Sequence, residues 1–405
     1  MTIPRRLKIL YLVHDLCDPS VARRIAMLRD GGAQVVVAGF RRDAEPVNNV
    51  TGCMAVDFGQ TFNGKFAQRM WSVTQEMRAI KDQQALYAGA DIIIARNLEM
   101  LAIAVKGREV ATEETLIVYE CLDIHRLLLG NTLPSKSLRW LEGRLAEKAS
   151  ALITSSPAFI SSYFNTLSHV KLPTMLVENK VYNPRQSATP PGGTPRPPGP
   201  PWKIGWFGAI RCRKSLEILA ELVKQGNGTV QVVIRGRPAL DQFDDFHATV
   251  EQTPGMQFLG PYKNPGDLAA IYRDVHFTWA IDMFEEGLNS SWLLPNRLYE
   301  GGLHCSVPIA ESAVETGRFL KNLGIGVVIP EPKSVFLSEF FATLTPQHYE
   351  QMERDAARIS RAAWLYSPQD CREMVNYLAS LHSQWTQSSQ PINVPTRQAD
   401  MAIVP

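Results

Sequence analysis

The sequence predicts an α/β protein with two doubly wound, Rossmann-like domains that face each other across a cleft. Short apolar, β-rich runs alternate with helical patterns along the chain, which is typical of this fold class. The alternation stops at a segment rich in proline and glycine and then restarts. The length of 405 residues also suits two domains of common size.

In the first half, several apolar runs have no polar face, so they predict a buried parallel sheet. Helices are predicted over residues 20–30, which end before two glycines, and over residues 136–148. The predicted strands cover residues 8–13, 34–38, 91–95, 116–119, 151–154 and 174–177. We therefore assign residues 1–183 to an N-terminal domain.

Residues 184–201 contain mostly proline, glycine and small polar residues, which indicates a linker. A second doubly wound domain is expected over residues 202–368. A helix at 369–387 is expected to pack back toward the N-terminal domain, and the tail at 388–405 shows no periodicity. The predicted strands of the second domain cover residues 202–207, 229–234, 256–259, 275–281 and 306–310, with helices from 215 and over 265–273.

The composition excludes several classes of protein. A formal net charge of +2 provides no overall field to attract nucleic acid. The six cysteines are scattered singly, without metal-ligand spacing, so reduced thiols in a cytoplasmic protein and no metal site are expected. No apolar run approaches the roughly twenty residues of a membrane-spanning helix, so any membrane contact would be peripheral, at the inner face of the plasma membrane.

Basic residues follow two predicted strands of the second domain. Gly208, Arg211 and Lys214 lie where the chain leaves one strand and enters a helix, an arrangement that suits a pyrophosphate. Arg235 follows the next strand, and its guanidinium group suits phosphate. The alternative is an ordinary turn with solvated cations.

A third candidate is Glu300, on a short helix before a glycine-containing turn. Its carboxylate could accept two hydrogen bonds from the vicinal hydroxyls of a ribose. Glu300 could otherwise be a solvated helix residue.

The segments WFGAIRCRKSLEIL, FLGPYKNPGDLAAIYRDVHFTWAI and PNRLYEGGLHCSVPIA resemble successive landmarks of the nucleotide-binding domain of GT-B glycosyltransferases. The resemblance is to family four and relatives that build bacterial exopolysaccharides. It implies that Lys214 contacts the donor pyrophosphate and that Glu300, the second glutamate of an E-x7-E element, binds ribose. Trp292 stands where the first glutamate is expected, and Ala209 stands where the family arginine usually follows Gly208.

The resemblance also implies a donor site that includes Asn296 and Leu298 beside Glu300. It places the nucleobase near Arg235 and Tyr262. The implied activity is transfer of a hexosyl group from a nucleoside-diphosphate sugar, with UDP expected, to a saccharide acceptor that is a candidate for lipid linkage. No cofactor is implied. The alternatives are a nucleotide-sugar epimerase of the same fold and a non-catalytic nucleotide-sugar-binding subunit.

In the N-terminal half, Asp123 and His125 follow a buried strand and are candidates for the general base of an inverting transferase. A retaining enzyme would use them only to position the acceptor, and a capped loop is the plainer interpretation. Asp18 is a further candidate base, while Ser20 is favoured as the cap of the following helix. Asn97 and Glu99 are weaker candidates.

Residues 62–81 and 136–148 mix lysine and arginine with large apolar residues at helical spacing. This pattern is typical of interfacial helices. Packing against the sheet is the favoured interpretation for both segments.

Overall fold

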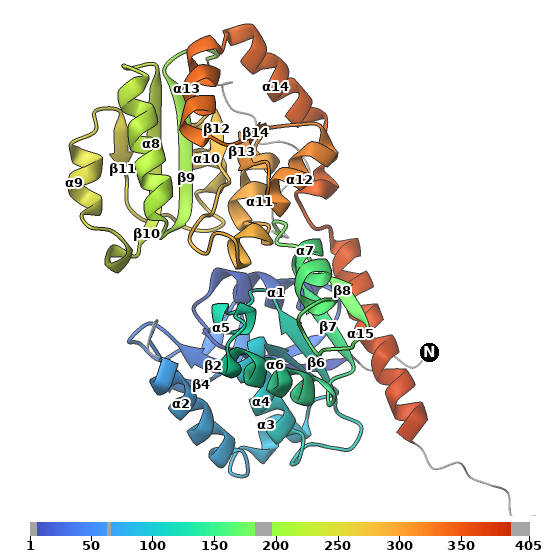
Figure 1. Ribbon diagram of the computed structural model, residues 1–405. Coiled ribbons are helices and arrows are strands. Elements are labelled where there is room, and N and C mark those ends of the chain that lie inside the picture. Colours follow the sequence, from blue (N-terminus) through green and yellow to red (C-terminus); the bar gives the residue numbers. More distant parts are fainter. Residues whose placement is uncertain (1–5, 63–65, 183–196, 390–405) are drawn as a thin grey trace, which may run out of the picture.

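The computed structural model describes residues 6–62, 66–182 and 197–389. They form two α/β domains, one above the other in Figure 1, and each domain is built on its own sheet. Most of the predicted linker, residues 184–196, lies outside the described residues. The prediction of two doubly wound domains is confirmed.

The N-terminal sheet has eight strands in the order β3-β4-β2-β1-β5-β6-β7-β8. All neighbours pair in parallel except β3 and β4. The strand order reverses between β1 and β5, and such a switch point leaves a crevice at the carboxyl ends of the strands. The strands are β1 (Lys8–Val13), β2 (Gln34–Arg41), β3 (Asn49–Val50), β4 (Cys53–Gln60), β5 (Ile92–Arg96), β6 (Leu116–Cys121), β7 (Ala151–Thr154) and β8 (Thr174–Leu176).

Alternate residues of these strands fill two separate cores. Tyr11 and Ile94 face α1 and α15, whereas Leu12 and Ile93 face the helices on the other side of the sheet. The helices are α1 (Pro19–Asp30), α2 (Phe66–Ala79), α3 (Gln84–Ala88), α4 (Asn97–Gly107), α5 (Arg126–Leu129), α6 (Leu133–Ala146), α7 (Pro157–Phe159) and, last in the chain, α15 (Pro368–Ser389). Both faces are therefore apolar, as the uninterrupted apolar runs predict.

The C-terminal sheet has six parallel strands in the order β11-β10-β9-β12-β13-β14. The order reverses between β9 and β12. The strands are β9 (Trp202–Ile210), β10 (Val230–Pro238), β11 (Met256–Phe258), β12 (Phe277–Trp279), β13 (Val307–Glu311) and β14 (Val327–Ile329).

Helices cover both faces of this sheet as well. One face packs against α8 (Arg213–Gln225), α9 (Phe246–Glu251), α13 (Lys333–Thr343) and α14 (Pro346–Arg358). The other face packs against α10 (Leu268–Arg273), α11 (Asn296–Leu303) and α12 (Glu315–Leu323).

Two strands, β4 and β14, were not predicted from the sequence. Strand β4 carries Asp57 and Gly59 and is half-exposed toward its end, so it lacks a clear apolar period. Strand β14 has only three residues, too few for a periodic signal. Strands β9 and β10 both run beyond their predicted ends, as far as Ile210 and Pro238.

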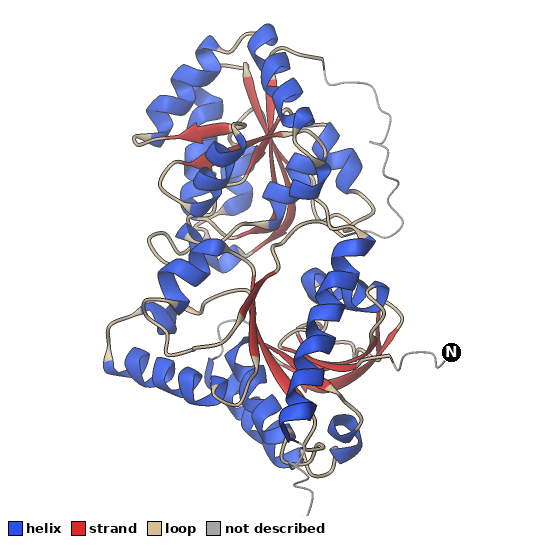
Figure 2. Ribbon diagram, turned by 90° about the vertical axis from the view of Figure 1, so that its right-hand side faces the viewer, coloured by secondary structure: helices blue, strands red, loops and turns tan. Residues whose placement is uncertain are grey.

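The last helix, α15, leaves the C-terminal domain and packs against α1 of the N-terminal domain (Figures 1 and 2). Its residues Met374, Val375 and Leu378 are buried in the same core as Val21 and Ile25 of α1. The two chain segments that run between the domains are also hydrogen-bonded to each other. Val181 donates its backbone N–H to the Trp364 carbonyl and accepts from the Tyr366 N–H. These contacts hold the domains together away from the cleft.

We expect Leu378→Ala to lower the free energy of unfolding by about 2–5 kcal/mol, the usual range for a large-to-small change in a core. Leu378 is fully buried between α15 and the sheet. The exposed neighbour Asn376 gives the control, and Asn376→Ala should stay within about 0.5 kcal/mol of the wild type. Urea unfolding followed by tryptophan fluorescence measures both variants, and equal values would contradict the packing of α15.

Candidate active site

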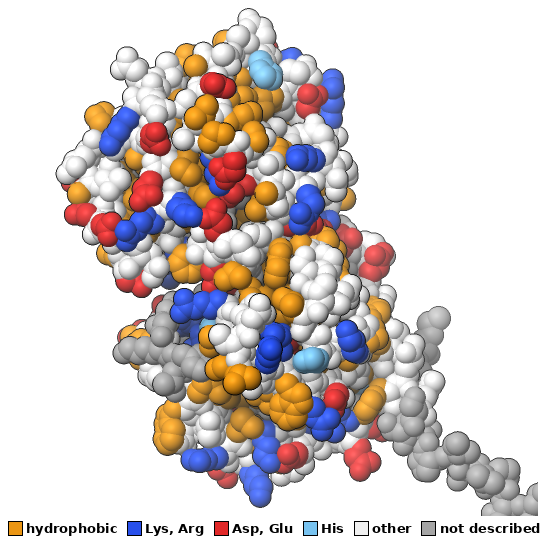
Figure 3. Space-filling view, in the orientation of Figure 1, with side chains coloured by type: hydrophobic (Ala, Val, Ile, Leu, Met, Phe, Trp, Pro, Cys, Tyr) orange, Lys and Arg blue, Asp and Glu red, His pale blue; other side chains and the backbone are white. Residues whose placement is uncertain are grey.

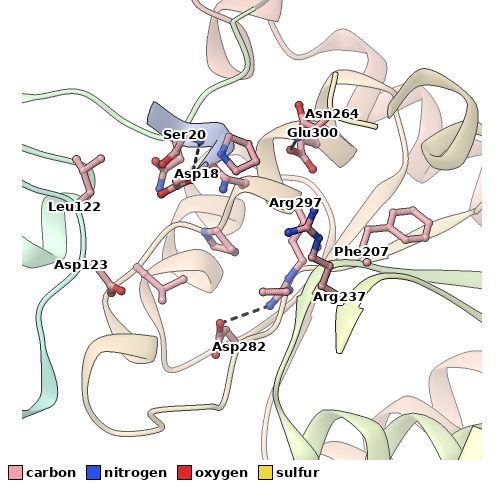
Figure 4. A pocket seen from close by; sticks show the side chains of 18 of the residues that line it. Asp18, Ser20, Leu122, Asp123, Phe207, Arg237, Asn264, Asp282, Arg297 and Glu300 are labelled. Atoms are coloured by element: carbon pink, nitrogen blue, oxygen red, sulfur yellow. Dashed lines mark hydrogen bonds and ion pairs between the residues drawn. The ribbon is translucent and has the colours of Figure 1, made fainter. Parts of the chain in front are cut away.

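A cavity of about 600 Å³ lies between the domains, at the carboxyl ends of both sheets. On one side its walls come from the segments that follow β1, β5 and β6. On the other side they come from the last residues of β9 and β10 and from the segments that follow β9, β11 and β12. Figure 4 shows Asp123 and Leu122 on the N-terminal side, facing Asp282, Arg297 and Arg237. The switch points of the two sheets thus open into one space.

Gly208 lies in the C-terminal wall of the cavity, where it exposes its backbone because it has no side chain. Its φ of +105° favours glycine, and Tyr262 lies beside it in the cavity wall. Gly236 on β10 faces the Gly208 carbonyl so closely that a Cβ atom would collide with it. The paired glycines allow a ligand or a neighbouring strand to approach the backbone here.

Three guanidinium groups line the C-terminal side, from Arg211, Arg237 and Arg297. The Asp282 carboxylate is 3.4 Å from Arg211 Nη2 and 3.7 Å from Arg297 Nη2. Burial alone would raise the pKa of Asp282, but Arg297 and Arg211 hold it below its ordinary value. The carboxylate therefore stays ionised and orients the two cations in the cavity.

Glu300, from α11, is buried and lines the same cavity. Its Oε1 accepts a hydrogen bond from Asn264 Nδ2 at 3.1 Å, and Oε2 accepts one from Tyr272 Oη at 2.8 Å. Burial raises the pKa of Glu300, while Tyr272 and Arg23 oppose that rise. The interpretation of Glu300 as a solvated helix residue is wrong.

Three other residues predicted for the donor site do not line this cavity. Lys214 is exposed and pairs with Glu286. Arg235 lies inside β10, because that strand continues to Pro238 and brings Arg237 to the cavity instead. Leu298 is packed in the core of the C-terminal domain.

Asn296 lies at the start of α11 and does line the cavity. Its Oδ1 accepts a hydrogen bond from Arg23 Nη1 of α1 at 3.1 Å. Arg23 also donates to Asn179, whose Nδ2 donates to the Leu294 carbonyl. These contacts join the two domains at one end of the cavity.

On the N-terminal side, Asp18 caps α1, since its Oδ1 accepts from the Ser20 backbone N–H at 2.8 Å. The expectation that Ser20 is the cap is therefore wrong. The Ser20 hydroxyl instead accepts a hydrogen bond from Arg96 Nη1 at 2.8 Å. Asp18 still lines the cavity, and Arg96 and His14 hold its pKa low against the effect of burial.

Asp123 and His125 occupy different positions. Asp123 lines the cavity and accepts a hydrogen bond from Asn289 of the opposite domain. His125 does not line the cavity and caps α5, with Nδ1 accepting from the Leu127 N–H at 3.3 Å. The imidazole that does line the cavity belongs to His14, which the sequence did not single out.

His14 follows β1 and lies 3.3 Å from Asn97 Nδ2 through its Nδ1. Burial lowers the pKa of His14 to about 4, although Asp18 opposes this effect. The ring is therefore uncharged at neutral pH, and its low pKa makes it a weak base. The one sequence signal for His14 as a cavity residue is its position directly after the predicted strand that ends at Val13.

A buried ionic cluster lies below this wall. Glu120 accepts hydrogen bonds from Arg24 Nε at 2.7 Å, from Arg96 Nε at 2.8 Å and from Tyr11 Oη at 2.5 Å. Burial would raise the pKa of Glu120, but the two arginines bring it to about 2. The cluster fixes the end of β5 and the start of α1, which carry Asn97 and Asp18.

In the described part of the chain, no three His, Cys, Asp or Glu side chains are grouped so that they could hold a metal ion. Within the same residues, no helix has the length and apolar character needed to cross a membrane.

Known structures share this architecture. Sucrose-phosphate synthase from Thermosynechococcus elongatus superposes with a TM-score of 0.69 at 13% identity, covering 95% of this chain and 100% of its own. HepE from Anabaena, solved in complex with UDP-glucose, has a TM-score of 0.62 at 14% identity, covering 95% of this chain and 99% of its own. The fold is the GT-B fold of glycosyltransferases.

The succinoglycan biosynthesis protein ExoL of Rhizobium meliloti strain 1021 is 46% identical over 387 residues, which cover 94% of this chain and 96% of ExoL. No protein-family model matches the chain. The chain belongs to the family of ExoL, a family of exopolysaccharide biosynthesis proteins.

We expect Glu120→Gln to destabilise the protein by about 3–5 kcal/mol at pH 7, because it removes the counter-charge of buried Arg24 and leaves buried Arg96 only the more distant Asp18. The exposed pair Glu109–Lys106 provides the control, and Glu109→Gln should cost at most about 1 kcal/mol. Urea unfolding at pH 7 measures both variants.

The same cluster predicts a pH dependence. The pKa of Glu120 is about 2 in the fold against an ordinary 4.5, so its stabilisation of about 3 kcal/mol is complete above pH 4.5. It is lost as the pH falls through about 2. A constant difference between the wild type and Glu120→Gln across this range would contradict the assignment.

Proposed function

We propose that this protein transfers a hexosyl group from a UDP-sugar to a saccharide acceptor during exopolysaccharide synthesis. The observation that carries the proposal is the buried Glu300 carboxylate in a cavity whose C-terminal side also carries three arginines. The ExoL relative supports the exopolysaccharide role. The complexes of HepE with UDP and with UDP-glucose support the donor class.

Glu300 is suited to hold the ribose of the donor. Each of its oxygens accepts one hydrogen bond from the protein. A carboxylate oxygen has a second lone pair, so both can still accept from the 2′- and 3′-hydroxyls. The buried position keeps water from competing with these contacts.

Arg211 and Arg297 are suited to bind the diphosphate, since guanidinium groups fit phosphate oxygens in a bidentate manner. They would stabilise the negative charge that develops on the leaving UDP. Lys214 can join them only by exchanging Glu286 for a phosphate, which its exposed side chain permits.

On the acceptor side, Asp123 is the proposed general base. Its carboxylate faces the cavity, whereas His125 uses Nδ1 as a helix cap. Burial raises the pKa of Asp123, and Arg211 and Asn289 limit that rise. His14 and Asp18 lie on the same wall and are suited to bind acceptor hydroxyls.

The test is a donor screen by thermal shift with UDP, GDP and their sugars. We expect UDP and a UDP-sugar to raise the melting temperature of the wild type. Glu300→Gln should weaken UDP binding by about 10-fold or more, because each hydrogen bond to a charged group contributes about 1.5–3 kcal/mol. Glutamine preserves the volume and the contact with Tyr272.

Glu221→Gln removes the same charge from the exposed face of α8 and should bind UDP like the wild type. A wild type whose melting temperature responds to no nucleotide would overturn the proposed function.

We also propose that the protein works at the inner face of the plasma membrane, where a lipid-linked acceptor would be found. One face of the N-terminal domain, which we call the apolar-basic face, carries exposed large apolar residues. They are Met70 and Trp71 of α2, Leu127 of α5, and Leu133, Trp140 and Leu141 of α6. Figure 3 shows such side chains together with lysine and arginine on this domain.

Trp71 and Trp140 are 62% and 61% exposed, so packing on the sheet does not account for them. Val73 of α2 and Ala146 of α6 do pack on the sheet. The two helices therefore have one buried side and one side that remains apolar in solvent. Exposed basic residues lie on or next to these elements, which suits anionic lipid. Lys136 and Arg144 are on α6, Arg126 begins α5, and Lys148 follows α6.

We expect the wild type to sediment with vesicles that contain phosphatidylglycerol more than with pure phosphatidylcholine. Lys136→Gln combined with Lys148→Gln should weaken that binding by about 30-fold, at about 1 kcal/mol for each charge. Trp71→Ser combined with Trp140→Ser should lower binding to both vesicles. The exposed apolar pair Leu240 and Val335 of the other domain gives the control, as serine variants without effect.

A further inference from the structure

The segment after β12, residues 282–293, belongs to the donor-side domain but makes contacts with the acceptor-side domain. Asp282 at its start holds Arg211. Trp292 and Leu293 at its end pack against the core of the N-terminal domain. The Trp292 carbonyl accepts a hydrogen bond from Ser156 Oγ at 2.5 Å. This packing role explains the tryptophan at the position where the family has its first glutamate.

Asn289 lies in the middle of this segment and is 2% exposed. Its Oδ1 accepts a hydrogen bond from the Ile124 backbone N–H at 3.1 Å, and its Nδ2 donates to Asp123 Oδ1. The two partners fix the orientation of the amide, because only the oxygen can accept and only the nitrogen can donate. Both partners belong to the opposite domain.

The segment itself is held by internal hydrogen bonds. Ser290 Oγ donates to Asp282 Oδ1 at 3.0 Å and accepts from the Glu285 N–H at 2.9 Å. Ser291 Oγ accepts from the Gly287 N–H at 3.0 Å. Asn289 is thus presented to Asp123 by a loop whose first residue also contacts the proposed phosphate-binding arginines.

We propose that Asn289 is a positioning residue of the transfer reaction, which holds Oδ1 of Asp123 and leaves Oδ2 to accept the proton of the acceptor hydroxyl. The inference rests on the proposed function, since it takes Asp123 as the base. It also makes the base depend on the closed arrangement of the domains, because Asn289 and Asp123 come from different domains. Separation of the domains would break this contact.

The charged groups around Asp123 come from several elements. Arg211 follows β9, Asp282 and Glu285 follow β12, and His125 lies two residues further along the same loop. Asn289 donates to the ionised carboxylate and thereby favours it. Loss of this donor should make Asp123 harder to ionise, so the acidic limb of the rate profile should move to higher pH.

The experiment compares Asn289→Ala and Asn289→Asp with the wild type. It uses the UDP-sugar found in the donor screen and a lipid extract of an ExoL-deficient R. meliloti strain as the acceptor fraction. We expect Asn289→Ala to lower kcat/KM by up to about 100-fold through misplacement of the base. Asn289→Asp should move the acidic limb up by about one pH unit or more, because two adjacent carboxylates share a proton.

Asn289→Asp has the same size and still accepts from Ile124, so it provides a folded variant if the alanine variant unfolds. Ser291→Ala is the control, because Ser291 belongs to the same turn and bonds only within the loop. UDP affinity should be equal in all variants.

A wild-type pH profile in Asn289→Asp would overturn the positioning role, even if its rate were lower. A wild type that neither binds UDP nor transfers sugar would instead overturn the proposed function.

Discussion

The structure depends on the pairing of Glu120 with Arg24 and Arg96 beneath the cavity. The carboxylate comes from β6, the guanidinium groups come from α1 and β5, and Tyr11 of β1 completes the set. None of these charges could be buried alone, so the elements must meet in one arrangement. That arrangement places the first turn of α1 beside the end of β5, where Asp18, Asn97 and His14 line the cavity. The N-terminal wall of the cavity therefore depends on a cluster that itself lies below the cavity.

The fold could be predicted because its signals are local. Apolar runs without a polar face identify the central strands β1, β5, β6 and β7. Strand ends also indicated where the polar residues of a cleft should lie, and Gly208, Arg211 and Asp123 do line the cavity. Strand β4 was missed because it is half-exposed toward its end, and β14 was missed because its three residues are too few to show a period.

The side chains of the site could be predicted only in part, because their direction depends on tertiary contacts. Arg235 and Arg237 are separated by one residue, and the sequence does not say how far β10 continues before the cavity begins. His125 and His14 both follow strands, yet His125 caps α5 and His14 lines the cavity. The same limit applies to Ser20 and Asp18, since either residue type can cap α1.

The tryptophan at position 292 and the contact made by Asn289 have one physical origin. A glutamate at position 292 would have to enter a largely apolar contact with the N-terminal core, where an unpaired carboxylate is costly. With tryptophan there, the loop docks on the opposite domain and brings Asn289 to Asp123. The C-terminal domain thus contacts the Asp123 side of the cavity through the amide of Asn289. Because that amide crosses the domain boundary, its hydrogen bond to Asp123 exists only when both domains are in contact. The base catalysis that we propose for Asp123 would then be confined to the closed state, from which water is largely excluded.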